Sequence, residues 1–142
     1  MEETQQAARQ LAETVLSGDK NRKGALVFAL YGDLGSGKTS FTQGIGSALG
    51  VVEPVISPTF IIERVYAISK NEFKRFVHID CYRFKESSEI EVLGWREMIK
   101  NPENIIVVEW AEKIEEYLPE DAVKIYFTHD DSGSGRIIES SK

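Results

Sequence analysis

The sequence predicts an α/β domain in which helices alternate around a mixed, mostly parallel sheet. Residues 25–31 form a continuously apolar run, which is typical of a strand buried on both faces. A glycine-rich turn follows this run, and an amphipathic segment follows the turn. A buried strand that leads through a turn into a helix is a common unit of α/β folds. Because the 142 residues show no internal repeat and no low-complexity linker, we expect one domain over residues 1–142.

Hydrophobic spacing assigns the elements of the first half of the chain. Apolar residues recur at helical spacing over residues 4–16, which predicts an amphipathic first helix. The strand at 25–31 follows, and residues 38–49 again show helical spacing, with Gly50 as a stop signal. Two prolines favour a loop over residues 51–59.

β-Rich segments and turn signals assign the second half. Residues 61–68 and 73–79 are separated by a polar turn and predict an antiparallel hairpin. The segment from Ser88 to Glu91 has the spacing of a capping box, so we expect a helix that begins there and continues to about Lys100. The remaining predicted strands are 105–108 and a closing hairpin made by 123–128 and 136–139.

Composition excludes several classes of function. The chain carries 17 Lys and Arg against 23 Asp and Glu, a formal charge of −6, and so lacks the basic surface of a protein that grips nucleic acid by itself. We therefore expect no direct sequence-specific nucleic-acid binding. The single cysteine, Cys81, permits no intrachain disulfide and favours a reducing, cytoplasmic setting. Neither a secretory signal nor an apolar run near the ~20 residues of a membrane span is visible, so we expect no membrane segment.

The strongest functional signal is the segment from Gly32 to Thr39, which fits the phosphate-binding pattern G-x-x-x-x-G-K-[ST] at every fixed position. Backbone amides of such a loop and the N-terminus of the following helix favour a phosphate chain. Lys38 would place its charge at the β- and γ-phosphates, the Thr39 hydroxyl would ligate Mg²⁺, and Ser40 could donate to an earlier phosphate. The residues predicted to bind the nucleotide here are Asp33, Leu34, Gly35, Ser36, Gly37, Lys38, Thr39 and Ser40.

A phosphate loop of this kind needs a carboxylate at the end of a neighbouring apolar strand, because Mg²⁺ prefers hard oxygen ligands. Two strands end this way, at Asp80 and at Glu109. Glu109 follows the purer apolar run and is our first choice for the magnesium ligand. Asp80 would then be available to orient the attacking water or a metal-bound water. His78 should share a strand face with Asp80, and such a histidine is more often a packed, hydrogen-bonded residue than a catalyst.

Other residues carry weaker signals, each with a structural alternative. Trp110 follows Glu109 and could pack beside a nucleotide, anchor a partner or serve in the core. Thr59 lies where phosphate-loop switch proteins place a loop that senses the γ-phosphate, although a plain turn would also fit. Arg83 and Arg136 could reach a phosphate, but exposed arginines are common.

Taken in order, these motifs resemble those of the TsaE (formerly YjeE) family, small bacterial P-loop ATPases of tRNA threonylcarbamoyladenosine synthesis. The resemblance extends over almost the whole chain. Its matching segments are residues 30–39, 57–60, 78–83, 89–94, 108–110 and the pair 135–136.

The resemblance implies a three-layer α/β P-loop domain that binds ATP with Mg²⁺ and hydrolyses it slowly. It also implies action with TsaB and TsaD, so that these partners would carry the tRNA contact while TsaD transfers the threonylcarbamoyl group to adenosine. The residue roles that it implies are Lys38, Thr39 and Ser40 on phosphates and metal, Glu109 as Mg²⁺ ligand, Asp80 as a catalytic acid, Trp110 near the active site, Thr59 in a switch-like loop and Gly135 close to the nucleotide. Ser40 stands where family members often carry Thr, a change that keeps the hydroxyl.

Two other functions compete with this interpretation. A P-loop small-molecule kinase shares the loop and often places an acid after a second strand, but no arginine-rich lid segment is visible to close over an acceptor. A guanine-nucleotide switch is weaker still, because the chain has no N-K-x-D motif to recognise the base. Phosphate release without an acceptor and a preference for ATP would count against both.

Overall fold

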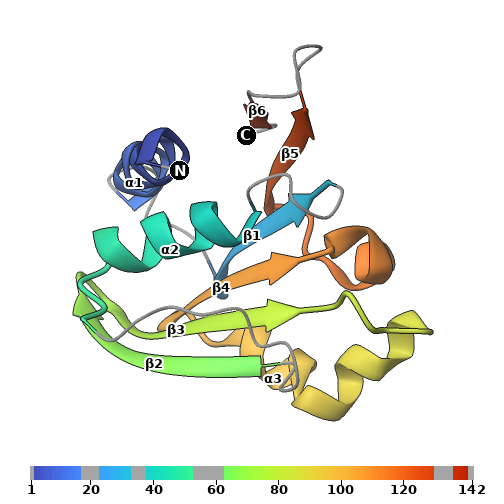
Figure 1. Cartoon of the computed structure of the whole chain (residues 1–142). Coiled ribbons are helices and arrows are strands. Elements are labelled where there is room, and N and C mark those ends of the chain that lie inside the picture. Colours follow the sequence, from blue (N-terminus) through green and yellow to red (C-terminus); the bar gives the residue numbers. More distant parts are fainter. Residues whose placement is uncertain (1, 17–22, 33–37, 53–62, 130–135, 141–142) are drawn as a thin grey trace.

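Helices cover both faces of a central sheet, which gives the chain three layers (Figure 1). The computed structural model describes residues 2–16, 23–32, 38–52, 63–129 and 136–140. Within them the sheet has six strands in the order β2-β3-β4-β1-β5-β6. The inner pairs β3–β4, β4–β1 and β1–β5 are parallel, whereas both edge pairs, β2–β3 and β5–β6, are antiparallel. The predicted α/β class with a mixed, mostly parallel sheet is confirmed.

The strands lie close to their predicted positions. In chain order they are β1 (Leu26–Tyr31), β2 (Glu63–Lys70), β3 (Phe73–Asp80), β4 (Asn104–Glu109), β5 (Val123–His129) and β6 (Arg136–Ser140). The first hairpin is tighter than predicted, because β2 runs on to Lys70 and leaves only two residues before Phe73. Asn71 makes this possible by adopting the left-handed region, with φ 55°, which asparagine tolerates better than most residues.

In the described part of the chain, two longer helices share one face of the sheet and three short ones cover the other. The helices are α1 (Glu2–Leu16), α2 (Lys38–Ala48), α3 (Trp95–Lys100) and two 3-10 helices, η1 (Ser87–Leu93) and η2 (Ala111–Tyr117). None of the described helices is long and apolar enough to span a membrane. Side chains alternate between the two faces, so β1 buries Leu26, Phe28 and Leu30 beneath α1 and α2 and Val27 and Ala29 on the other side.

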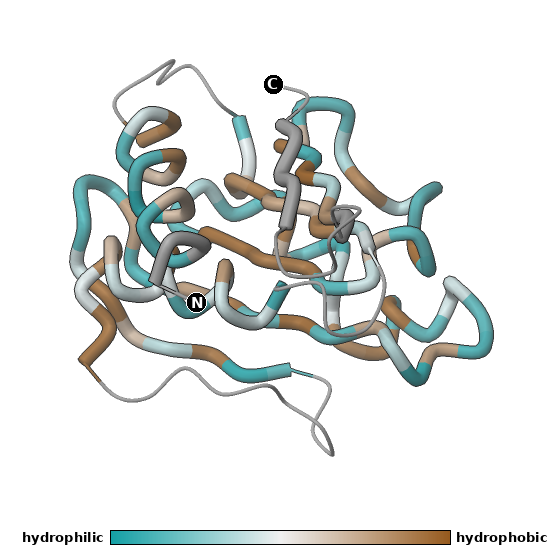
Figure 2. The backbone as a smooth tube through the Cα atoms, turned by 45° about the horizontal axis from the view of Figure 1, so that its top comes forward, coloured by the Kyte–Doolittle hydropathy of each residue, from teal (hydrophilic) through white to brown (hydrophobic). Residues whose placement is uncertain are grey.

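Hydrophobic residues run along the central strands, whereas hydrophilic residues dominate the outer loops (Figure 2). Every residue of β4 is buried, as the unbroken apolar run predicts for a strand covered on both faces. Each face has its own core. The α1–α2 side includes Phe41, Ile45, Phe76 and Phe127, and the opposite side includes Ile79, Phe84, Ile90, Trp95 and Ile114.

Gly44 allows α1 and α2 to pack with their backbones close together. A β-carbon at this position would lie 2.4 Å from the carbonyl oxygen of Gln5 and 2.8 Å from the β-carbon of Ala8. Both distances are shorter than van der Waals contact, so a side chain here would push α1 away from α2. Because α2 begins at Lys38, this contact also supports the helix that presents the end of the phosphate loop.

The prediction of one helix that begins with a capping box at Ser88 is wrong in two respects. The helix N-cap is Glu86 rather than Ser88, and the Glu89 carboxylate accepts the backbone N–H groups of Lys85 and Glu86. The chain then breaks at Gly94, whose φ of 77° separates η1 from α3. A glycine in the left-handed region ends a helix readily, so two short helices replace the single predicted one.

The helix η2 was not predicted at all. It follows β4 and is connected to the sheet through Glu115, whose carboxylate accepts hydrogen bonds from the Tyr31 hydroxyl and from Lys124, both at 2.6 Å. The hydrogen bond from Lys124, and after it the one from Tyr31, hold the pKa of Glu115 below its usual value. Burial, followed by the bond to Glu115, raises the pKa of Tyr31. A short helix with few periodic apolar positions gives little sequence signal, which explains why it was missed.

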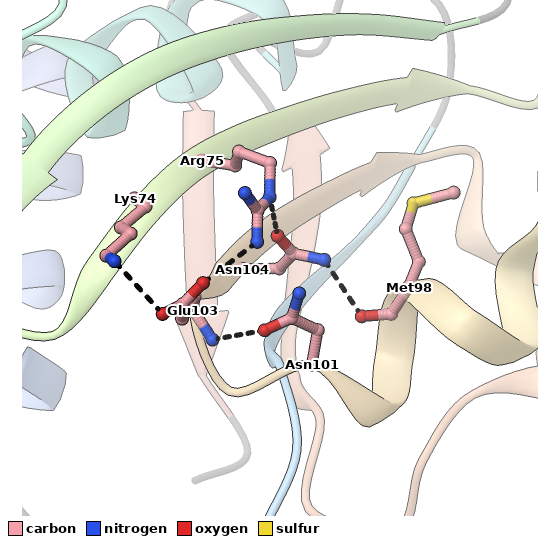
Figure 3. Close-up of polar contacts among 6 residues, drawn as sticks. All are labelled: Lys74, Arg75, Met98, Asn101, Glu103 and Asn104. Carbon is pink, nitrogen blue, oxygen red and sulfur yellow. Dashed lines mark hydrogen bonds and ion pairs between the residues drawn. The ribbon is translucent and has the colours of Figure 1, made fainter.

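A polar network fixes β3 against β4 at the end of the sheet opposite the carboxyl ends of these strands (Figure 3). Asn104 is buried and accepts a 2.7 Å hydrogen bond from Arg75 Nε, while its amide donates to the carbonyl of Met98 at 3.0 Å. Arg75 also bonds Glu103, and Lys74 forms an ion pair with the same carboxylate. Asn104 therefore connects β3, β4 and α3 through one side chain.

We predict that Asn104→Ala lowers the free energy of unfolding by about 1–3 kcal/mol, because it leaves a guanidinium nitrogen and a backbone carbonyl without their partner. Lys74→Ala is the matched control: its ion pair is largely exposed, with the lysine side chain 66% accessible, and should contribute less than about 0.5 kcal/mol. Urea unfolding followed by circular dichroism measures both. Equal effects of the two substitutions would show that the buried amide has no special role.

Candidate functional site

Lys38 begins α2 directly after the glycine-rich segment. Its side chain is buried, at 5% exposure, although it carries a charge. The ammonium group donates a hydrogen bond to the carbonyl of Gly32 and lies 4.0 Å from the ring centroid of Trp110. A backbone carbonyl at the end of β1 and an aromatic face after β4 therefore hold the cation at the carboxyl end of the sheet.

Glu109 ends β4 and is the most enclosed acid of the site, at 2% exposure. In the sheet it stands between two neighbours, opposite Leu30 of β1 and opposite Asp80 of β3. Its Oε1 lies 3.3 Å from the hydroxyl of Thr39, and its Oε2 lies 3.3 Å from the hydroxyl of Thr42. The carboxylate thus faces the first turn of α2, as expected of a strand-end acid beside a phosphate loop.

His78 contacts the same carboxylate from β3. Its Nε2 lies 2.6 Å from Oε2 of Glu109, and the histidine is fully buried. Among the described residues Nδ1 has no hydrogen-bond partner. The prediction that His78 is a packed, hydrogen-bonded residue is confirmed, and the structure adds that its partner is the strand-end acid itself.

Asp80 ends β3 beside Glu109 and is half-buried. Its Oδ1 accepts the backbone N–H of Tyr82 at 2.9 Å, which fixes the turn that leaves the strand. The Tyr82 ring in turn packs against Trp110, with 5.1 Å between ring centroids. The two strand ends, one after Asp80 and one after Glu109, are therefore joined by an aromatic contact at the edge of the site.

Trp110 occupies a strained backbone conformation. Its φ of 59° and ψ of 45° lie in the left-handed region, which costs a residue with a side chain about 1–2 kcal/mol. The sharp turn lets the chain leave β4 immediately after Glu109 and begin η2 at Ala111. The turn also places the indole beside Lys38. Of the alternatives that the sequence offered for Trp110, the structure therefore supports a position at the candidate site.

The Cys81 side chain has no described contact with these polar groups, although its backbone N–H donates to the Glu109 carbonyl at 3.0 Å. The thiol is fully buried within the core on the η1–α3 side. Burial raises the pKa of the Cys81 thiol well above its usual value, and the neighbouring Asp80 carboxylate raises it further. A thiol in these surroundings stays protonated and is a poor nucleophile, so Cys81 serves as a small buried side chain of the core.

The structure describes only part of the predicted site. Lys38, Thr39, Asp80, Glu109 and Trp110 come together at the carboxyl ends of β1, β3 and β4, and Ser40 is buried in the first turn of α2. Of the other predicted residues, Asp33, Leu34, Gly35, Ser36, Gly37, Thr59 and Gly135 lie outside the described residues. Arg83 is exposed, and Arg136 begins β6, opposite His129 in the backbone register of β5 and β6.

Sequence reasoning missed one member of the cluster, Thr42. It stands four residues after Lys38 in α2 and is fully buried. Residues three and four positions apart share a helix face, so a helical projection from Lys38 and Thr39 would have placed this hydroxyl toward the same strand end. Its hydroxyl also lies 3.0 Å from the carbonyl oxygen of Lys38.

The residues of the cluster fit a magnesium nucleotide. A threonine hydroxyl and a carboxylate oxygen 3.3 Å apart offer the hard oxygen donors that Mg²⁺ prefers, and the buried Lys38 ammonium offers a charge for phosphates. No group of three His, Cys, Asp or Glu side chains suited to a metal occurs in the part of the chain that the structure describes. Mg²⁺ commonly relies on one or two carboxylates together with substrate phosphates and water, so this donor set is sufficient.

Comparisons with known proteins agree on one family. A family model described as "Threonylcarbamoyl adenosine biosynthesis protein TsaE" matches residues 1–138. Proteins named tRNA threonylcarbamoyladenosine biosynthesis protein TsaE are similar to this chain: that of Borreliella burgdorferi is 39% identical over 80% of this chain and 79% of its own length, and that of Bacillus subtilis is 38% identical over 87% and 70%. Among solved structures, the crystal structure of Bacillus subtilis YdiB matches with a TM-score of 0.73 and 30% identity, covering 98% of this chain and 78% of that one.

We predict that nucleotide binding changes the fluorescence of Trp110, because phosphates would compete with the indole face for the Lys38 ammonium. The chain has two tryptophans, and Trp95 is buried on the other side of the sheet, where its indole N–H donates to the Tyr117 carbonyl. The emission of the wild-type chain should therefore change saturably with Mg-ATP, whereas Trp110→Phe, which leaves Trp95 alone, should show no change. Binding detected by calorimetry without any change in emission would contradict this prediction.

Proposed function

The chain belongs to the TsaE family of threonylcarbamoyl adenosine biosynthesis proteins, and from this premise we propose that it is a Mg²⁺-dependent ATP-binding and ATP-hydrolysing subunit. It would support threonylcarbamoyl transfer to adenosine in tRNA together with TsaB and TsaD. The setting would be the cytoplasm, where tRNA is modified. The acidic charge of −6 supports a division of labour in which the partners, rather than this chain, hold the tRNA.

One observation carries the proposal: the Thr39 hydroxyl and the Glu109 carboxylate meet 3.3 Å apart beside the buried ammonium of Lys38. These groups come from the start of α2 and the end of β4, which lie far apart in the sequence and are brought together by the parallel pairing of β1 with β4. A fold that placed a chance glycine motif next to a strand would not also be expected to place a buried acid against its threonine.

The roles we assign follow from this arrangement. Lys38 would bind the β- and γ-phosphates, Thr39 and Glu109 would hold Mg²⁺, and Ser40 would donate to a phosphate. Bound Mg²⁺ would neutralise charge that develops on the phosphate oxygens. The cradle made by residues 33–37, the contact of Gly135 with the nucleotide and the sensing role of Thr59 belong to the same proposal and rest on the sequence motif and family resemblance.

Asp80 is the acidic residue that we propose to act in catalysis, as a carboxylate that faces the attacking water. Its place next to Glu109 in the sheet puts a second carboxylate at the same strand ends, and its half-buried position leaves it accessible to a water molecule. A carboxylate that positions or deprotonates an attacking water contributes typically about 10²–10⁴-fold to a rate. Because Asp80 also accepts the Tyr82 N–H, substitution by asparagine is a cleaner test than substitution by alanine.

We expect the chain to form a complex with TsaB and TsaD in the presence of Mg-ATP, which size-exclusion chromatography of the three purified proteins can measure. Lys38→Ala should abolish the nucleotide-dependent complex, because it removes the charge proposed to face the phosphates. Lys74→Ala, at the opposite end of the sheet, should behave as the wild type does. Failure to detect any nucleotide-dependent complex would overturn the proposed partnership. Phosphate transfer to a small acceptor instead of water would favour the kinase alternative.

We further expect Asp80→Asn to lower the rate constant of ATP hydrolysis by about 100-fold while changing nucleotide affinity by less than about threefold. Lys38→Ala should instead weaken affinity by about 10- to 100-fold and lower turnover as well, since it removes a charge-assisted contact. Steady-state phosphate release and equilibrium binding separate the two effects. Equal losses of rate and affinity in Asp80→Asn would make Asp80 a binding residue rather than a catalytic one.

A further inference from the structure

The two oxygens of the Glu109 carboxylate have different surroundings. Oε2 lies 2.6 Å from His78 Nε2 and 3.3 Å from the Thr42 hydroxyl, whereas Oε1 lies 3.3 Å from the Thr39 hydroxyl. Thr42 can also donate to the carbonyl of Lys38, at the shorter distance of 3.0 Å. His78 is therefore the main partner of Oε2, and Oε1 is the oxygen turned toward the phosphate loop.

From this asymmetry we propose that His78 is a positioning residue, which holds Oε2 of Glu109 so that Oε1 is presented to Mg²⁺ beside Thr39. The inference rests on the proposed function, because it concerns how the proposed magnesium ligand is oriented. Outer partners of metal ligands are known to fix ligand orientation, and losing one typically costs about 10- to 100-fold in metal affinity or activity. His78 would act through Glu109 and would touch neither nucleotide nor metal.

The role of the ring nitrogen follows from its partner. A carboxylate oxygen accepts hydrogen bonds, so Nε2 of His78 acts as the donor to Oε2 of Glu109. Both side chains are enclosed, at 0% for His78 and 3% for Glu109, so water does not compete for this hydrogen bond. A single short bond in a closed environment restricts the rotation of the carboxylate far more than an exposed contact would.

A role in stability alone explains the buried His78–Glu109 pair less well than the proposed role in orienting Glu109. Taking a carboxylate out of water is costly, and apolar side chains of similar volume often stabilise a core at least as well as a buried pair does. Phe76, two residues before His78 and on the same face of β3, shows that this face holds apolar side chains. The buried pair is therefore better explained by the orientation it gives to Glu109 than by a gain in stability.

The test compares His78→Asn with His78→Gln. Both replacements are neutral amides, but the shorter asparagine places its NH₂ group near the position of Nδ1, while glutamine extends toward the position of Nε2 and can still reach Glu109. The measurement is the Mg²⁺ concentration that gives half of the full increase in nucleotide affinity, from equilibrium titrations with a fluorescent ATP analogue, with EDTA as the metal-free reference. Ile79→Val, a packing change on the other face of β3, is the control.

We expect His78→Asn to need about 10- to 100-fold more Mg²⁺ while its affinity in EDTA stays that of the wild type. His78→Gln and Ile79→Val should keep the wild-type magnesium requirement. A wild-type requirement in folded His78→Asn would overturn the positioning role. If that variant does not fold, His78→Phe, which keeps a ring at this position but removes the hydrogen-bond donor to Oε2, should raise the requirement, and a wild-type requirement there would equally overturn the proposal. An absence of Mg²⁺-dependent binding in the wild-type chain would instead refute the proposed function.

Discussion

The burial of the Glu109 carboxylate is the constraint on which the arrangement of the site depends. An ionised acid at 2% exposure is costly unless hydrogen-bond donors surround it, and the donors here come from two different elements. Thr39 and Thr42 approach from α2, and His78 approaches from β3. Satisfying this one group therefore requires α2 to start over the end of β4 and requires β3 and β4 to keep their register, because a slip of one residue would turn His78 to the other face of the sheet.

The chain must also leave the sheet immediately after this acid, and the way it does so shapes the edge of the site. Trp110 takes the left-handed conformation, and the cost of about 1–2 kcal/mol is offset by contacts that an extended strand would not provide. Its indole lies against the Lys38 ammonium on one side and packs with Tyr82 on the other. Strain next to a functional group is most easily retained where the surrounding contacts enforce it, and here they do.

The sequence was most informative where a physical pattern repeats over several residues. Unbroken apolar runs predicted the positions of β1 and β4, and the acid after the second run is the strand-end residue Glu109 that lies beside Thr39. The short helices were harder, because a capping pattern at Ser88 competed with the true N-cap at Glu86 and one glycine, Gly94, split the predicted helix. The bond between His78 and Glu109 could not be predicted, because it depends on the register of β3 against β4, which no local pattern encodes.

The two opposite charges of the candidate site, the Lys38 ammonium and the Glu109 carboxylate, have different described partners. Lys38 and Glu109 are both buried at the same sheet edge, and a direct ion pair between them would satisfy each at the expense of binding. Instead the described contacts of Glu109 are with His78, Thr39 and Thr42, while Lys38 bonds the Gly32 carbonyl and lies over Trp110. A carbonyl and an aromatic face hold a cation less strongly than a phosphate chain does, because neither carries a full negative charge. Among the described contacts, the ammonium and the carboxylate thus keep separate partners at the same edge of the sheet.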